Sequence, residues 1–139
     1  SDGDRRTIEF VRTEFRDMGL DVETQWIDVY LSTPISAELE IVRTGGAAVH
    51  EPLPIKERPA DDYSADPEIS FGWNAYSASG EVTGEIVYAN YGTRADFDRL
   101  ATLGIDCAGK IVIARYGGNY RGYKAKFAEE AGAIGLIIY

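Results

Sequence analysis

The strongest constraint on the fold is a set of three short apolar runs in the C-terminal third of the chain, at residues 86–89, 111–114 and 134–139. An unbroken apolar run of this length is typical of a strand buried on both faces. Two segments of helical pattern, 93–103 and 122–130, separate the runs. The order strand, helix, strand, helix, strand predicts a largely parallel sheet with right-handed crossovers.

Local signals mark where these two helices begin and end. Thr93-Arg94-Ala95-Asp96 has the form of a capping box, and Gly104 follows the last inward-facing leucine of the first helix. The glycine-containing turn Gly117–Gly122 leads into the second helix, which Gly132 ends. Because the run 134–139 predicts a buried strand, we expect the protein to continue past Tyr139.

The N-terminal half has weaker patterns. Apolar residues recur at helical spacing over 4–18, and Gly19 fits the left-handed position that ends a helix. Alternation predicts a strand over 25–31, and 38–43 predicts another before a turn at Gly45 and Gly46. The segment 52–67 contains proline and aspartate without periodicity, and predicts a loop.

Charge and cysteine content exclude several classes of protein. The 139 residues carry 14 Lys and Arg against 23 Asp and Glu, a net charge of -9, which argues against binding to nucleic acid or to an anionic membrane. No apolar run approaches the length of a membrane span. The single cysteine, Cys107, cannot form an internal disulfide, and we interpret it as a buried apolar thiol rather than a reactive one.

The chain offers no complete catalytic or metal-binding set. A zinc site normally draws on several His and carboxylate ligands, and His50 is the one histidine. A Ser-His-Asp triad would need the same residue, and no G-x-S-x-G motif is present. The neighbouring carboxylates Asp61-Asp62 and Glu129-Glu130 point apart and predict solvated charge. We therefore expect no catalytic residue and no metal ligand in this segment.

The turn Gly117–Gly122 is the one candidate binding site. It places Arg121 at the start of a helix, where free N–H groups and the helix dipole favour an anion. The guanidinium is a planar fork that matches a carboxylate. The spacing alone leaves two interpretations open, an anion site and a structural turn with a solvated arginine.

The same region carries a family resemblance. Gly109–Gly117, with sequence GKIVIARYG, is followed by Arg121-Gly122, Lys124, Ala131-Gly132-Ala133 and the run to Tyr139. This pattern resembles the core of protease-associated (PA) domains, and more narrowly that of the glutamate carboxypeptidase II family. Similar features extend back to Gly19-Leu20-Asp21, so the resemblance covers nearly the whole chain and is weakest over 38–66.

The resemblance implies a domain division and a fold. Residues 1–33 are expected to be a helix-strand segment of the peptidase domain, and 34–139 a PA domain incomplete at its C-terminus. The fold class is α/β, with a β-rich part and a parallel βαβαβ part in the PA domain.

The resemblance also implies an activity, a zinc-dependent M28-type carboxypeptidase acting on peptides with a free C-terminal carboxylate, preferably acidic. By motif, Arg121 binds the α-carboxylate and Tyr120 lines the same pocket, where the family has Phe. Two zinc ions, a calcium ion and all catalytic residues are expected outside this segment, which alone should be inactive. A homodimer facing the extracellular space or periplasm, free or membrane-anchored, is implied for the full-length protein.

Two other readings stay open. A non-enzymatic relative such as the transferrin receptor shares the layout but lacks the Arg-Gly pair seen here at Arg121-Gly122. A PA domain can also act as a lid or interaction module on another class of protease, for example a subtilisin or an aminopeptidase, although the peptidase-like opening over 4–32 argues against a subtilisin.

Overall fold

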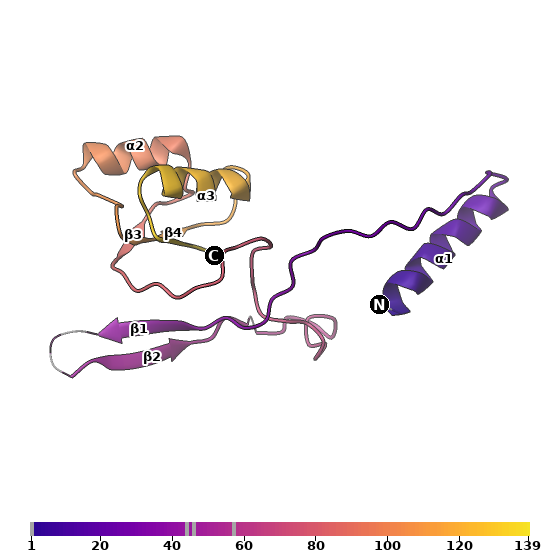
Figure 1. Ribbon diagram of the computed structural model, residues 1–139, viewed down its shortest axis with the longest axis horizontal. Coiled ribbons are helices and arrows are strands. Elements are labelled where there is room, and N and C mark those ends of the chain that lie inside the picture. The colour runs from indigo at the N-terminus through magenta and orange to yellow at the C-terminus, as the bar shows by residue number, and fades with distance from the viewer. Residues whose placement is uncertain (1, 44, 46, 57) are drawn as a thin grey trace. The chain divides into compact units, whose positions relative to one another are not determined.

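The computed structural model describes residues 2–43, 45, 47–56 and 58–139. Its contacts divide the chain into two compact units, Ser1–Ser77 and Ala78–Tyr139. Each unit is described by itself (Figure 1). The turn predicted at Gly45 and Gly46 includes Gly46, which lies outside the described residues.

The first unit contains one helix and one hairpin. Helix α1 spans Asp2–Asp17 and is followed by Gly19, whose φ of 81° confirms the predicted left-handed ending. Strands β1, Leu39–Arg43, and β2, Val49–Leu53, pair antiparallel. None of the residues of α1 is buried, although its apolar side chains share a face as predicted.

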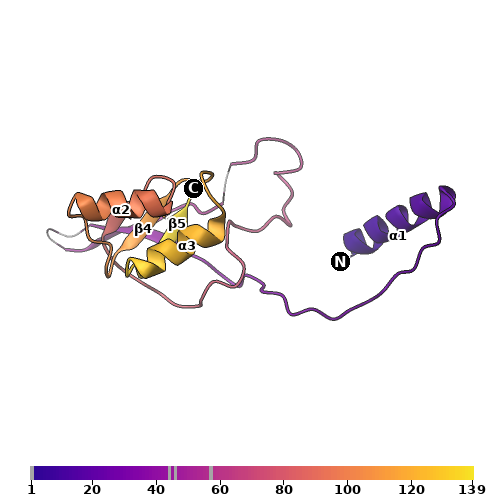
Figure 2. The ribbon, with the colours of Figure 1, turned by 90° about the horizontal axis from the view of Figure 1, so that it is seen from above.

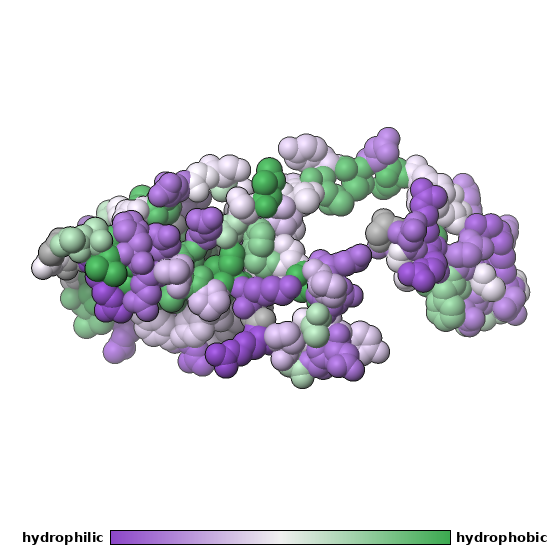
Figure 3. Space-filling view, turned by 90° about the horizontal axis from the view of Figure 1, so that it is seen from below, coloured by the Kyte–Doolittle hydropathy of each residue, from purple (hydrophilic) through white to green (hydrophobic). Residues whose placement is uncertain are grey.

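Two expectations for this unit are wrong. The strand predicted over 25–31 is absent, because no described strand pairs with this segment and an unpaired strand leaves its backbone groups without partners. The segment instead exposes several large side chains: Trp26, Ile27, Val29, Tyr30 and Leu31. Exposed isoleucine, valine and leucine residues of this kind are drawn in green in Figure 3. The loop predicted from Pro52 begins later, because Pro52 lies inside β2 opposite Glu40.

The second unit is the predicted βαβαβ arrangement. Strands β3, Ile86–Tyr88, β4, Ile111–Ala114, and β5, Gly135–Ile138, form a parallel sheet in the order β3-β4-β5. Helices α2, Arg94–Thr102, and α3, Arg121–Glu130, connect them and lie on the same side of the sheet (Figures 1 and 2). The predicted α/β class, with a hairpin and a parallel part, is confirmed.

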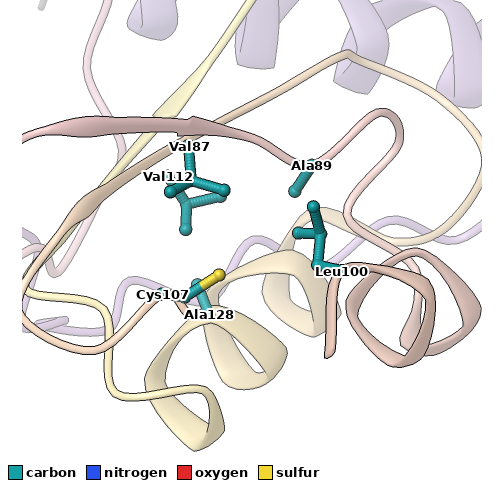
Figure 4. Close-up of a cluster of buried hydrophobic side chains, with 6 residues drawn as sticks. All are labelled: Val87, Ala89, Leu100, Cys107, Val112 and Ala128. Atoms are coloured by element: carbon teal, nitrogen blue, oxygen red, sulfur yellow. The ribbon is translucent and has the colours of Figure 1, made fainter. Parts of the chain in front are cut away.

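The core of this unit lies between the sheet and the two helices (Figure 4). Val112 is fully buried at the centre of the middle strand, and Cys107 is buried beside Ala128, which confirms the interpretation of this thiol as a buried residue. The six residues are Val87, Ala89, Leu100, Cys107, Val112 and Ala128.

The expectation that the first run is buried on both faces is wrong. Val87 and Ala89 are buried, whereas Ile86 and Tyr88 are 60% and 50% exposed. Because both helices of the unit cover one face of the sheet, alternate side chains of β3 point to the uncovered face.

Among the described residues, no helix has the length and hydropathy needed to cross a bilayer.

Candidate functional site: the loops at the carboxyl edge of the parallel sheet

Two loops meet where β3 and β4 end. The first covers residues 89–93 and leads to α2; the second covers 115–120 and leads to α3. The strands are parallel, so their carboxyl ends and the loops that follow them lie at one edge of the sheet. The Arg115 N–H donates to the Asn90 carbonyl at 2.7 Å, which joins the two loops directly.

Arg121 is the first residue of α3, and its side chain is exposed. Its guanidinium carbon lies 5.7 Å from the centroid of the Tyr116 ring, a cation–π contact. Within the part of the chain that the structure describes, no carboxylate forms an ion pair with it. The guanidinium donors therefore face outward and are not occupied by an internal acid.

The helix that begins at Arg121 has no side-chain cap. Tyr120 occupies the N-cap position and accepts no side-chain hydrogen bond from the first turn. By contrast, α2 begins with a complete capping box between Thr93 and Asp96, as its sequence predicts. Free N–H groups and the positive end of the helix dipole thus lie beside Arg121.

Tyr120 is 72% exposed and its ring lies beside the same helix start. A Cβ added at Gly122 would lie 3.0 Å from Tyr120 Cε1, so the ring passes directly over this glycine. Tyr120 also makes an edge-to-face contact with Tyr123, with ring centroids 6.3 Å apart. An exposed aromatic surface therefore lies at the start of α3, the helix that begins with Arg121.

The turn between β4 and α3 depends on two glycines. Gly117 and Gly118 have φ angles of 84° and 75°, in the left-handed region that side chains disfavour. Gly118 lies against Tyr91. The Tyr91 ring also makes a cation–π contact with Arg115, whose guanidinium carbon lies 4.8 Å from the ring centroid. Tyr91 thus packs against the turn through both Gly118 and Arg115.

A buried lysine lies beneath the turn. Lys124 is 1% exposed, and its Nζ donates to Gly117 O at 2.6 Å, to Asn119 Oδ1 at 2.7 Å and to Tyr91 O. The Asn119 amide donates in turn to Gly92 O at 3.2 Å. Burial lowers the pKa of Lys124 because it disfavours the charged form, and the negative charge of Asp96 acts in the opposite direction.

Asp96 holds the neighbouring loop. Its burial opposes ionisation, but hydrogen bonds from Asn90 and Thr93 outweigh that effect and lower the pKa of Asp96. The ionised carboxylate therefore fixes the 89–93 loop, against which the 115–120 loop rests.

The other polar residues considered from sequence make local contacts within their own units. His50 lies on β2, with Nδ1 2.8 Å from Glu40 Oε2 on β1. Asp61 accepts from Ser64 in a local turn, and Glu130 pairs with Arg94. Among the residues described, no three His, Cys, Asp or Glu side chains are grouped to hold a metal ion, so a zinc pair does not fit here.

The sequence predicted Arg121 and Tyr120 as site residues, whereas Lys124 entered only as part of the family motif and Asn119 had no predicted role. A signal was present, because Lys124 shares the inward face of α3 with Ala128 and, just past the helix, Ala131, at spacings of four and seven. A lysine in such an apolar row needs hydrogen-bond acceptors at its tip. The turn Gly117–Asn119 just before the helix supplies them.

Comparisons with known proteins agree with this architecture. The family model described as PA domain matches residues 82–139. The protein named "Probable glutamate carboxypeptidase" from Arthroderma benhamiae is 38% identical over 131 residues, covering 94% of this chain and 18% of its own length. "Glutamate carboxypeptidase 2 homolog" from Caenorhabditis briggsae is 32% identical, covering 100% of this chain and 19% of its own.

A third relative has an aminopeptidase name. "Aminopeptidase NAALADL1" from Mus musculus is 32% identical over 142 residues, covering 98% of this chain and 19% of its own length. A solved aminopeptidase from Aneurinibacillus sp. strain AM-1 is 37% identical with a TM-score of 0.40, covering 47% of this chain and 15% of that chain. The chain thus spans less than a fifth of the relatives it matches.

The family match and the compact second unit begin within a few residues of each other, at 82 and 78. The assignment of 1–33 to a peptidase domain and of 34–81 to the PA domain stays a prediction. Residues 82–139 match the PA domain family, and the chain is similar over nearly its whole length to a part of proteins named as glutamate carboxypeptidases.

Proposed function

We propose that this chain supplies the substrate-binding PA region of a zinc metallopeptidase that removes C-terminal, preferably acidic, residues from peptides. In this proposal Arg121 binds the free α-carboxylate of the substrate. One observation carries it: the Arg121 guanidinium is exposed at an uncapped helix start and has no carboxylate partner among the described residues.

The chemistry of the helix start favours a carboxylate. An arginine can donate two parallel hydrogen bonds to the two oxygens of such a group, and the free N–H groups of α3 add to its stabilisation. A hydrogen bond to a charged group contributes about 1.5–3 kcal/mol. An exopeptidase needs such a contact because it must measure its cleavage site from the end of the peptide.

Tyr120 would line the pocket beside the carboxylate. Its ring lies over Gly122 next to Arg121, and it offers both an aromatic face and a hydroxyl. The hydroxyl makes this wall more polar than the phenylalanine that the family resemblance leads us to expect. In this proposal Tyr120 influences which substrate side chain is accepted, whereas Arg121 recognises the free C-terminus of the substrate.

The remaining parts of the proposal lie outside these residues. The two zinc ions, the calcium ion and the groups that carry out hydrolysis would come from other parts of the full-length protein, since no cluster of metal ligands occurs in the described part of this chain. A homodimer is proposed for the full-length protein, facing the extracellular space or periplasm, free or membrane-anchored.

One relative favours a second candidate. Because "Aminopeptidase NAALADL1" is similar over nearly the whole of this chain, removal of N-terminal residues is an alternative activity. The two activities differ in the peptide end they require. A free C-terminus is essential for a carboxypeptidase, and a free N-terminus for an aminopeptidase.

The test uses the full-length protein and three forms of one peptide: unblocked, C-terminally amidated and N-terminally acetylated. A carboxypeptidase cleaves the acetylated peptide and spares the amide; an aminopeptidase does the reverse. Arg121→Ala should raise the KM for the unblocked peptide by about ten- to hundredfold, the equivalent of the lost charged hydrogen bonds, and leave bound metal unchanged.

Arg99→Ala is the matched control, because it removes an exposed arginine from the last turn of α2. Its KM should equal that of the unmodified protein. An unchanged KM in Arg121→Ala would remove this residue from the site. Failure of the full-length protein to cleave any of the three peptides would favour the non-enzymatic, receptor-like reading.

A further inference from the structure

We infer that Lys124 is a positioning residue: its ammonium group ties the 115–120 loop to the 89–93 loop and so fixes where Arg121 projects. Only the role of this tie, which is to place Arg121 for ligand binding, rests on the proposed function. The tie itself is a property of the described residues and can be tested without substrate.

The three partners of Lys124 match the donors of an ammonium group one for one. Nζ has three N–H donors, and it meets Tyr91 O, Gly117 O and Asn119 Oδ1. No buried side-chain nitrogen or oxygen among the described residues lacks a hydrogen bond. The lysine is therefore fully satisfied and has no donor left for a ligand.

The partners are all in loops. Gly117 and Asn119 belong to the 115–120 loop, while Tyr91 belongs to the 89–93 loop, which Asn119 contacts again through Gly92 O. One side chain thus closes a ring of hydrogen bonds across the carboxyl edge of the sheet. Removing Lys124 would leave two backbone carbonyls and one amide oxygen without this partner.

The 115–120 loop needs such a tie. Consecutive glycines at 117 and 118 have no side chains that could pack and hold the turn, and glycine has the widest range of backbone angles. Helix α3 also lacks a side-chain cap that would anchor its start. Lys124 lies in the first turn of that helix, three residues after Arg121, so it couples the loop to the residue that would bind the ligand.

Core packing alone does not account for a lysine here. Its neighbours on the inward face of α3 are apolar, and burial of an ammonium group opposes its charged form. An apolar side chain of similar length would fill the space without that cost, but would leave the loop carbonyls unsatisfied. The gain from lysine is therefore a defined loop geometry.

The tie is tested by hydrogen exchange on the full-length protein. Lys124→Met should speed exchange of the hydrogen-bonded amides of 115–123, those of Arg115, Tyr116 and Tyr123, at least about tenfold, the equivalent of losing one buried hydrogen bond, and leave 94–102 of α2 unchanged. If residues 115–123 exchange equally fast in Lys124→Met and in the unmodified protein, the inference is overturned, whatever the effect of Arg121→Ala on KM. Faster exchange throughout 82–139 would also overturn it, because that result marks a general loss of stability.

Milder variants keep the test informative if Lys124→Met does not fold. Asn119→Asp retains an oxygen acceptor for Lys124 and loses only the amide donor to Gly92 O, whereas Asn119→Ala loses both. Asn119→Ala should speed exchange in 115–123 severalfold, and Asn119→Asp should exchange more slowly than Asn119→Ala because the contact with Lys124 is kept. Equal exchange in the two variants would show that the lysine contact does not hold the loop.

Kinetics then separate the tie from the proposed function. If Arg121 binds the carboxylate, Lys124→Met should raise KM for a free-acid peptide with little change in kcat, and should have no further effect in an Arg121→Ala background. If Arg121→Ala itself leaves KM unchanged while exchange in 115–123 responds to Lys124→Met, the proposed function fails and the tie stands. Additive effects of the two substitutions would contradict positioning through Arg121.

Discussion

Gly118 lies so close to Tyr91 that a Cβ added to the glycine would be 2.7 Å from the Tyr91 Cβ, well inside van der Waals contact. The two residues belong to different loops, so their contact fixes the separation between the ends of β3 and β4. The close approach accounts for a glycine at this position independently of its left-handed φ of 75°.

A matched pair of substitutions separates these two reasons. Gly118→Ala should lower the free energy of unfolding by about 1–2 kcal/mol for the left-handed backbone and by about 1–3 kcal/mol more for the clash with Tyr91. Gly104 has a similar φ of 72° but nothing within 4 Å of an added Cβ, so Gly104→Ala should show the backbone cost alone. Urea titration of both variants measures the difference, and equal losses would show that Tyr91 moves aside freely.

The capping box of α2 predicts a dependence of stability on pH. The pKa of Asp96 is lowered in the folded state, so its contribution is complete above the unfolded pKa of about 4 and is lost as pH falls through the folded pKa. Asp96→Asn should lower the free energy of unfolding at pH 7 by about 1 kcal/mol, a typical capping contribution. The difference from the unmodified chain should shrink as the pH drops below about 4. A difference that is the same at pH 7 and pH 3 would assign the effect to shape and not to charge.

Removal of the Tyr120 hydroxyl should change side-chain preference in the full-length protein. Tyr120→Phe should lower kcat/KM for peptides ending in glutamate relative to peptides ending in leucine, by about tenfold or less. The reason is that the substitution removes the polar hydroxyl from the aromatic side of the pocket. The ratio between free-acid and amidated peptides should not change, since Arg121 is retained. If that second ratio changes, the hydroxyl contributes to recognition of the terminus as well.

The chain itself should not hydrolyse peptides. The residues described hold no cluster of metal ligands, so purified chain incubated with zinc and the unblocked peptide should give no more product than zinc alone. The full-length protein is the positive control. Turnover that requires both this chain and zinc would place catalytic groups within it and contradict the proposal.

Sequence reasoning worked best where local patterns and the final fold agree. The apolar run 111–114 became the central strand β4, and the capping-box sequence at Thr93 begins α2. Gly104 follows the end of that helix with a positive φ, as predicted. These features depend on neighbours in sequence, and so they can be identified without knowledge of tertiary contacts.

The errors arose where structure depends on distant partners. Alternation over 25–31 has the period of a strand, but a strand also needs a second strand to pair with, and the described residues offer none. Likewise, the apolar composition of β3 gave no sign that Ile86 and Tyr88 face away from the two helices.

The candidate site was half predictable. Arg121 and Tyr120 follow from the motif and from the place of the turn between a strand and a helix. Lys124 was not recognised because a lysine is normally a solvated residue, and its burial depends on carbonyl groups of two loops that are separated in sequence.

The side chains at the starts of α2 and α3 have different roles, because those of α2 cap the helix and those of α3 do not. The side-chain oxygens of Thr93 and Asp96 form hydrogen bonds that cap α2 and hold the preceding loop, so most replacements there should lower the thermal stability of the domain. The side chains of Tyr120 and Arg121 form no hydrogen bond with the other described residues, so replacements there leave the internal hydrogen bonds of the domain intact. New binding preferences could therefore evolve at positions 120 and 121 without compensating mutations elsewhere, and related PA domains that recognise different groups should diverge there first.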